Sequence, residues 1–119
     1  MYTSFTLAIP VKKPLEVAQW YKEYLGLSEV QVIDNTTYEV EIMSNLWLQF
    51  YSDEKKIDGL PLILRMGVDD LNSIVHEFKR TKRNIELGKE VQGIRYLYSQ
   101  ENPWGQKIGF YELLNEGDN

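Results

Sequence analysis

Hydrophobic and polar residues alternate with two different periods along this chain. In residues 3–9 every second side chain is apolar, which predicts a strand that Pro10 closes. In residues 14–25 the apolar side chains instead recur every three or four positions, which predicts a helix. Pro14 suits the first turn of that helix, and Gly26 suits the position just after its end.

The same reasoning predicts a second helix and seven further strands. The second helix follows Asp69 and Asp70, whose negative charge a helix N-terminus favours, and ends in a group of Lys and Arg residues. Residues 53–60 are polar and charged, so we expect a linker there. The remaining strands are expected near 28–33, 37–43, 46–51, 61–68, 84–90, 94–100 and 106–113.

The predicted elements follow the order βαβββ twice, which indicates an internal duplication. When the two halves are compared at an offset of 57 residues, the positions expected to be buried on the helices coincide, such as Tyr21 with Phe78. We therefore expect one α+β domain, residues 1–119, built from modules near 3–52 and 61–114, with disorder only in the tail 115–119.

Composition removes several classes of function. The chain has no Cys and one His, so thiolate metal sites and sites that need two imidazoles are excluded. Its net charge of -5 argues against a nucleic-acid partner, because such proteins carry basic patches. No uncharged run approaches the roughly 20 residues of a membrane span, and no basic segment precedes the first apolar run. We expect a cytoplasmic protein with no membrane partner.

Four segments resemble the vicinal oxygen chelate superfamily, which includes glyoxalase I, bleomycin-resistance proteins and extradiol dioxygenases. They are residues 11–14 (VKKP), residues 20–27 (WYKEYLGL), residues 102–105 (NPWG) and residues 108–113 (IGFYEL). The resemblance implies tandem βαβββ modules whose mixed sheets curl into cups. It also implies a homodimer that binds a small organic molecule in a cleft.

In the metal-dependent members of this superfamily, four inward side chains hold a divalent ion. The resemblance places those positions at Thr6, Trp47, Ile63 and Glu112, of which only Glu112 is a good ligand. A catalytic metal generally needs about three protein ligands, and neither an indole nor an isoleucine side chain donates one. We therefore expect no metal and no cofactor.

Period-two alternation extends this inward face to neighbouring residues. The predicted ligand-binding residues are Trp47, Gln49, Tyr51, Arg65, Phe110 and Glu112. The aromatic members could instead close the cup and pack as a second core. Arg65 and Glu112 could form a structural salt bridge or orient a ligand, and Glu112 is also a candidate general base. His76, on the second helix, is expected to be a solvated surface residue.

Three functions remain open at this point. The favoured one is a metal-independent binding protein of the bleomycin-resistance type that sequesters a drug, and an acidic protein suits a cationic ligand. The alternative is an enzyme, a glyoxalase I-like lyase or isomerase that uses Glu112. The third is an accessory domain whose cleft is vestigial and whose surface contacts a partner protein.

Overall fold

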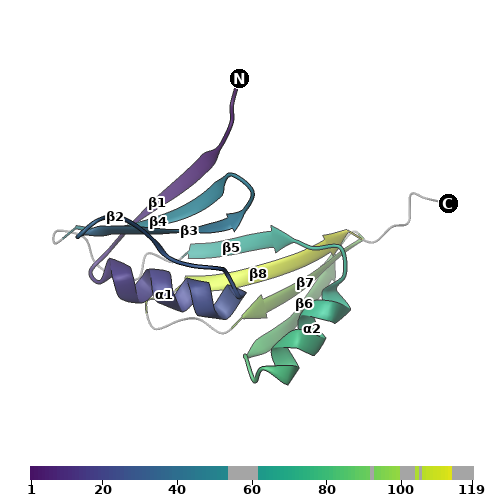
Figure 1. Ribbon diagram of the computed structural model, residues 1–119. Coiled ribbons are helices and arrows are strands. Elements are labelled where there is room, and N and C mark those ends of the chain that lie inside the picture. The colour runs from purple at the N-terminus through teal and green to yellow at the C-terminus, as the bar shows by residue number, and fades with distance from the viewer. Residues whose placement is uncertain (54–61, 92, 100–103, 105, 114–119) are drawn as a thin grey trace. The chain divides into compact units, whose positions relative to one another are not determined.

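The computed structural model describes residues 1–53, 62–91, 93–99, 104 and 106–113. Within them the elements follow the order βαβββ twice, which confirms the predicted fold class. The chain divides into two compact units, Met1–Asp58 and Gly59–Asn119 (Figure 1). Apart from Asp53 and Trp104, the predicted linker, the turn at 102–105 and the tail lie outside the described residues.

The bounds of the elements are close to those predicted from the sequence. The first unit contains β1 (Phe5–Val11), α1 (Pro14–Leu25), β2 (Gln31–Asp34), β3 (Thr37–Met43) and β4 (Leu46–Ser52). The second unit contains β5 (Leu62–Gly67), α2 (Leu71–Arg80), β6 (Ile85–Val91), β7 (Ile94–Ser99) and β8 (Gln106–Leu113).

Each unit holds one four-stranded mixed sheet of the same topology. The strand order is β1-β4-β3-β2 in the first sheet and β5-β8-β7-β6 in the second. The first and last strands of each unit pair in parallel, and the other pairs are antiparallel. The helix lies between the two parallel strands along the chain because a parallel pair needs a crossover connection, and Figure 1 shows each helix beside its own sheet.

Pro10 lies inside β1 and does not close it, contrary to the prediction. The backbone N–H of Phe5 donates to the carbonyl oxygen of Asn45, so alternate residues from Phe5 onward turn their polar groups toward β4. The nitrogen of Pro10 therefore points away from β4. Because β1 is an edge strand of this sheet, the missing donor of Pro10 costs no ladder hydrogen bond.

The helix α1 packs its apolar face on the first sheet. Val17, Ala18 and Tyr21 are fully buried, and the Tyr21 ring stacks on Phe50 with centroids 5.0 Å apart. The helix ends at Gly26, whose φ of 68° lies in the left-handed region that glycine adopts most easily. These contacts form the core of the first unit.

The helix α2 packs on the second sheet through Leu71 and Phe78. Its N-cap is Asp70, whose carboxylate accepts the Asn72 backbone N–H at 3.0 Å and the Ser73 hydroxyl at 2.8 Å. In the described part of the chain, neither helix has the length and apolar character that crossing a bilayer requires.

Candidate ligand-binding faces

Each sheet has one face against the helix of its own unit and one face turned away from it, which we name the distal face. Because Phe50 contacts α1, alternate β4 residues face that helix and the residues between them face the other way. With their register partners, the residues of the first distal face are Thr6, Ala8, Pro10, Thr37, Glu39, Glu41, Trp47, Gln49 and Tyr51.

Trp47, Gln49 and Tyr51 lie together on the first distal face, as their spacing predicted, and each is half-buried. The side-chain amide of Gln49 donates to the carboxylate of Glu39 at 3.2 Å. Glu41 is the register partner of Trp47 on the neighbouring strand. The face therefore presents a hydrogen-bonded polar pair between two aromatic side chains, with a second carboxylate beside one of them.

Phe110 does not lie on the distal face of the second sheet, contrary to the prediction. Its side chain is 4% exposed and packs edge to face against Phe78 of α2, with ring centroids 5.5 Å apart. Phe110 is thus a core residue under the helix. The alternative that the predicted aromatics are core residues holds for this one.

Glu112 also lies on the helix side, because it is two residues from Phe110 on the same strand. One carboxylate oxygen, Oε1, accepts the backbone N–H of Leu71 at 2.6 Å. Leu71 is the first residue of α2, so Glu112 satisfies a donor that the helix itself leaves without a partner. The predicted inward placement of Glu112 is therefore wrong, and its carboxylate caps a helix.

Arg65 lies on the distal face of the second sheet, where its register partner is Gly109. Arg65 and Glu112 are consequently on opposite faces, so the alternative of a structural salt bridge between them is wrong, as is that of joint contact with a ligand on one face. The residues of the second distal face contributed by β5 and β8 are Ile63, Arg65, Gly67, Lys107, Gly109, Tyr111 and Leu113.

Lys107, Gly109 and Tyr111 were missed by the sequence reasoning, although a signal for them exists. The segment 108–111 (IGFY) repeats 48–51 (LQFY), with the phenylalanine of each facing its helix. This repeat has an offset of 60 residues, three more than the offset that aligns the helices. Applying the larger offset to the last strand would have assigned its faces correctly.

The residues present do not fit the metal centre of the metal-dependent superfamily members. Ile63 lies on the second distal face, whereas Glu112 lies on the helix side of the same sheet, so these two positions do not converge. Among the described residues, no group of three or more His, Cys, Asp or Glu side chains is placed to hold a metal ion. The donor set required for such a centre is therefore missing from this part of the chain.

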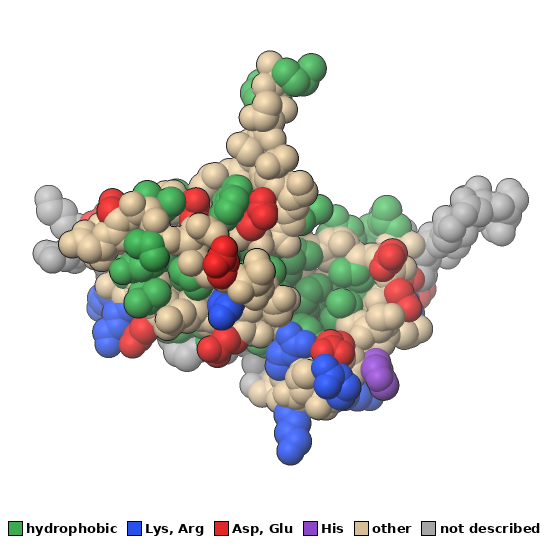
Figure 2. Space-filling model, viewed as in Figure 1, with side chains coloured by type: hydrophobic (Ala, Val, Ile, Leu, Met, Phe, Trp, Pro, Cys, Tyr) green, Lys and Arg blue, Asp and Glu red, His purple; other side chains and the backbone are tan. Residues whose placement is uncertain are grey.

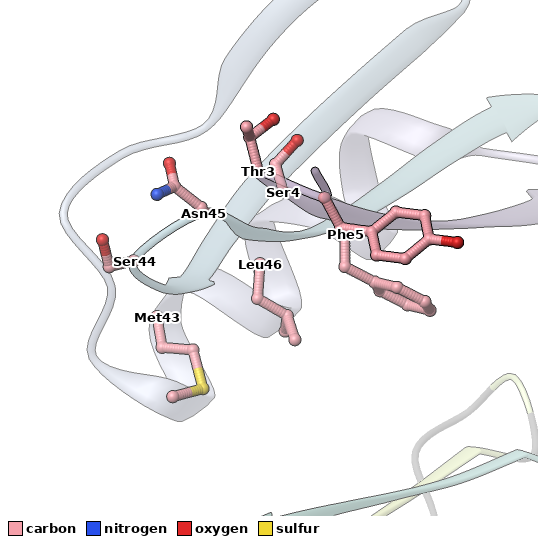
Figure 3. A pocket seen from close by; sticks show the side chains of 8 residues that line it. Thr3, Ser4, Phe5, Met43, Ser44, Asn45 and Leu46 are labelled. Carbon is pink, nitrogen blue, oxygen red and sulfur yellow. The ribbon is translucent and has the colours of Figure 1, made fainter.

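A hollow of about 550 Å³ lies at the end of the first sheet where β1 begins. Figure 3 shows the side chains of Phe5, Leu46 and Met43 on one side of the ribbon and those of Thr3, Ser4 and Asn45 on the other. The hollow is wide open to solvent, and Phe5 and Met43 are 60% and 62% exposed. An open, apolar rim of this kind offers contact area but few polar groups to orient a ligand.

The shifted pKa values belong to helix ends and turns. The Ser73 hydroxyl, followed by the Asn72 N–H and the charge of Arg95, lowers the pKa of Asp70. The Arg80 guanidinium lowers the pKa of Glu77, with a smaller contribution from Arg83. Each of these contacts stabilises α2 and its ends.

Charged side chains at the turn and on the outer surface are solvated. In the β2–β3 turn, the backbone N–H and hydroxyl of Thr36 lower the pKa of Asp34. His76 is exposed, as predicted, and Figure 2 shows the single histidine at the surface beside Lys and Arg side chains. Trp20 is half-buried and stacks on Tyr24, with centroids 4.7 Å apart.

Comparison with known proteins identifies the fold. No family model and no curated protein matches the sequence. Among solved structures, a glyoxalase/bleomycin resistance protein from Catenulispora acidiphila has a TM-score of 0.70 at 15% identity, over 93% of this chain and 98% of that one. TnmS3, an antibiotic-binding protein from a Streptomyces species, has a TM-score of 0.73 at 14% identity, over 95% and 97%.

A third structural neighbour is described as an oxidase. Oxidase ChaP-H2 has a TM-score of 0.67 at 17% identity and covers 93% of each chain. At these identities the likeness establishes the glyoxalase/bleomycin-resistance fold. The predicted resemblance is confirmed at that level.

Proposed function

We propose that this protein binds a small organic molecule on the first distal face, without a metal ion. The observation that carries the proposal is the arrangement of Trp47 and Tyr51 on either side of the Gln49–Glu39 hydrogen bond. Small-molecule sites are commonly lined in this way, by aromatic side chains with a few polar groups that fix orientation.

The charge of the face favours a cationic ligand. Glu39 and Glu41 are the only charged side chains among its residues from β1, β3 and β4 in the described part of the chain. A cation over the face of an indole gains about 0.5–2 kcal/mol, depending on its desolvation. Trp47 beside Glu41 supplies both attractions at one place, and the net charge of -5 adds a weak general attraction.

The fold supports a binding role through one neighbour, since TnmS3 is described as an antibiotic-binding protein. We extend the proposal to drug sequestration in the cytoplasm by a homodimer, with the ligand cleft at the interface. Sedimentation equilibrium tests the dimer, because a dimer doubles the 14.0 kDa mass of the chain. A monomer over the whole working range of concentration would contradict that part.

A library of cationic and neutral aromatic compounds, screened by thermal shift, tests the main proposal. A ligand at 100 times its Kd should add about 2.7 kcal/mol to the free energy of unfolding. Trp47→Ala should weaken a binder by about fivefold or more, because an aromatic contact contributes about 1 kcal/mol beyond area burial. Trp20→Phe, on α1, is the matched control and should bind as the wild type.

Treatment with a chelator separates the proposed binding from metal chemistry. Retained affinity after chelation supports metal-independent binding, and loss of affinity contradicts it. No stabilisation by any compound would favour the accessory-domain alternative. The enzyme alternative based on Glu112 is disfavoured, because that carboxylate already caps α2 on the other side of its sheet.

A further inference from the structure

The C-terminal end of α2 is strongly cationic, although the chain as a whole is acidic. Four of the five residues 79–83 (KRTKR) are Lys or Arg, and Glu77 is the one acidic residue between positions 71 and 85. Four cations and one carboxylate give this segment a charge of +3, so the rest of the chain must carry -8 to reach the total of -5. Figure 2 shows Lys and Arg side chains gathered around the single histidine, where Figure 1 draws α2. We name residues 79–83 the basic end of α2.

The helix dipole accounts for only part of this charge. Cations in the last turn of a helix face the negative end of its dipole, which suits Lys79 and Arg80. Lys82 lies past the helix end with a φ of 58°, in the left-handed region that is strained for a residue with a Cβ. Both helices end with the same pair of backbone hydrogen bonds, and α1 has Gly26 at the corresponding place. A lysine is thus held where a glycine would be more stable, and strain of this kind is often found at functional sites.

Arg83 is held in one position at the basic end of α2. Its guanidinium carbon lies 4.1 Å from the centroid of the Phe78 ring, and its Nε donates to the Thr81 hydroxyl oxygen at 2.7 Å. The side chain is 19% exposed. Because these contacts already restrict its rotamers, Arg83 loses little further entropy when it contacts an anion.

The acidic residue of this segment does not neutralise the two lysines. Glu77 accepts hydrogen bonds from Arg80 with both of its carboxylate oxygens. Among the residues that the structure describes, no ion pair includes Lys79 or Lys82, and both are exposed. Two ammonium groups next to an ordered guanidinium therefore remain for an external anion, with which they would form charge-assisted hydrogen bonds.

We propose that the basic end of α2 binds a short acidic segment of a partner protein. In an extended peptide, next-but-one side chains lie on the same side about 6.6 Å apart. Carboxylates at this spacing can contact Lys79, Lys82 and Arg83 together. The surface is separate from both distal faces, so this inference goes beyond the function proposed above and does not depend on it.

The surroundings of the basic end favour a short peptide over a nucleic acid. The 10 residues of α2 rise about 15 Å, and Asp69 and Asp70 lie at the other end of the helix. A long polyanion lying along α2 would meet these carboxylates, and the charge of -8 on the rest of the chain would repel it. Phe78 is 3% exposed, so its ring offers no surface on which a base could stack.

Amide NMR titration of the full chain with a capped hexaglutamate peptide tests the proposal. Hexaglutamate should produce saturable shifts at residues 79–83 in about 20 mM salt, and the neutral probe hexaglutamine should not. Binding should weaken severalfold in about 0.3 M salt, because salt screens exposed charges. The absence of saturable shifts with hexaglutamate would overturn the proposal. Tighter binding of hexathymidylate at the same amides would also overturn it, in favour of a nucleic acid.

Lys82→Gly separates a binding role from a structural one. Glycine fits the positive φ, so this variant should melt about 2–4 °C above the wild type. It should nevertheless bind hexaglutamate about two- to fivefold more weakly, the usual effect of losing one exposed ion pair. Lys79→Gln should weaken binding by a similar factor.

Lys22→Gln is the matched control. It removes the same charge from the last turn of α1, 57 residues before Lys79, and should bind hexaglutamate like the wild type. The proposal is overturned if Lys82→Gly and Lys79→Gln both bind like the wild type. It is equally overturned if Lys22→Gln weakens binding as much as they do, since the peptide would then respond only to net charge.

Discussion

Replacing Glu112 tests whether its carboxylate caps α2 or serves a ligand. Glu112→Ala removes the acceptor of the Leu71 N–H, whose residue is fully buried at the start of α2. A hydrogen bond to a charged group contributes about 1.5–3 kcal/mol, and a negative charge at a helix N-terminus adds about 0.3–1 kcal/mol. We expect a loss of about 2–3 kcal/mol in the free energy of unfolding.

Urea denaturation followed by circular dichroism measures this loss, and two further variants interpret it. Glu112→Gln keeps an oxygen acceptor and removes the charge, so it should lose only about 1 kcal/mol. Glu86→Ala, at an exposed position of β6, should stay within about 0.5 kcal/mol of the wild type. Ligand affinity of the folded Glu112→Ala protein should be unchanged. The capping role would be refuted if Glu112→Ala were as stable as Glu86→Ala but had lost ligand binding.

Three further predictions concern the helices. Phe110→Ala should lower the free energy of unfolding by about 3–5 kcal/mol, because the ring is buried against Phe78. Thermal denaturation measures this loss, and a value below about 1 kcal/mol would be inconsistent with a core position. Gly26→Ala should lower the free energy of unfolding by about 1 kcal/mol, because alanine is strained at the positive φ of this position even though an added Cβ would meet no other atom. An unchanged melting temperature would contradict this. The pKa of Asp70 is lowered in the folded protein, chiefly by Ser73, so its stabilisation is present above the unfolded pKa and is lost as the pH falls through the folded pKa. Asp70→Asn should flatten the dependence of stability on acid pH, which urea melts at several pH values will show.

The periodicity of the sequence was sufficient for the elements and their order. The prediction gave the correct bounds for α1, β3 and β8, and it identified the glycine that ends α1. Helix caps and strand alternation are local properties of the chain, so they can be recognised from the sequence. The grouping of Trp47, Gln49 and Tyr51 on one face followed from alternation along a single strand. These features need no contact between distant residues.

The face that each strand turns toward its helix was decided by tertiary structure. Alternation divides β8 into two sets but does not say which set meets α2, and a shift of one residue exchanges them. The packing of Phe78 on Phe110 makes that choice, and it carries Glu112 to the helix N-terminus and Tyr111 to the other face. The sequence alone determined the duplicated scaffold, while long-range packing determined which side chains of the second unit are available to a ligand.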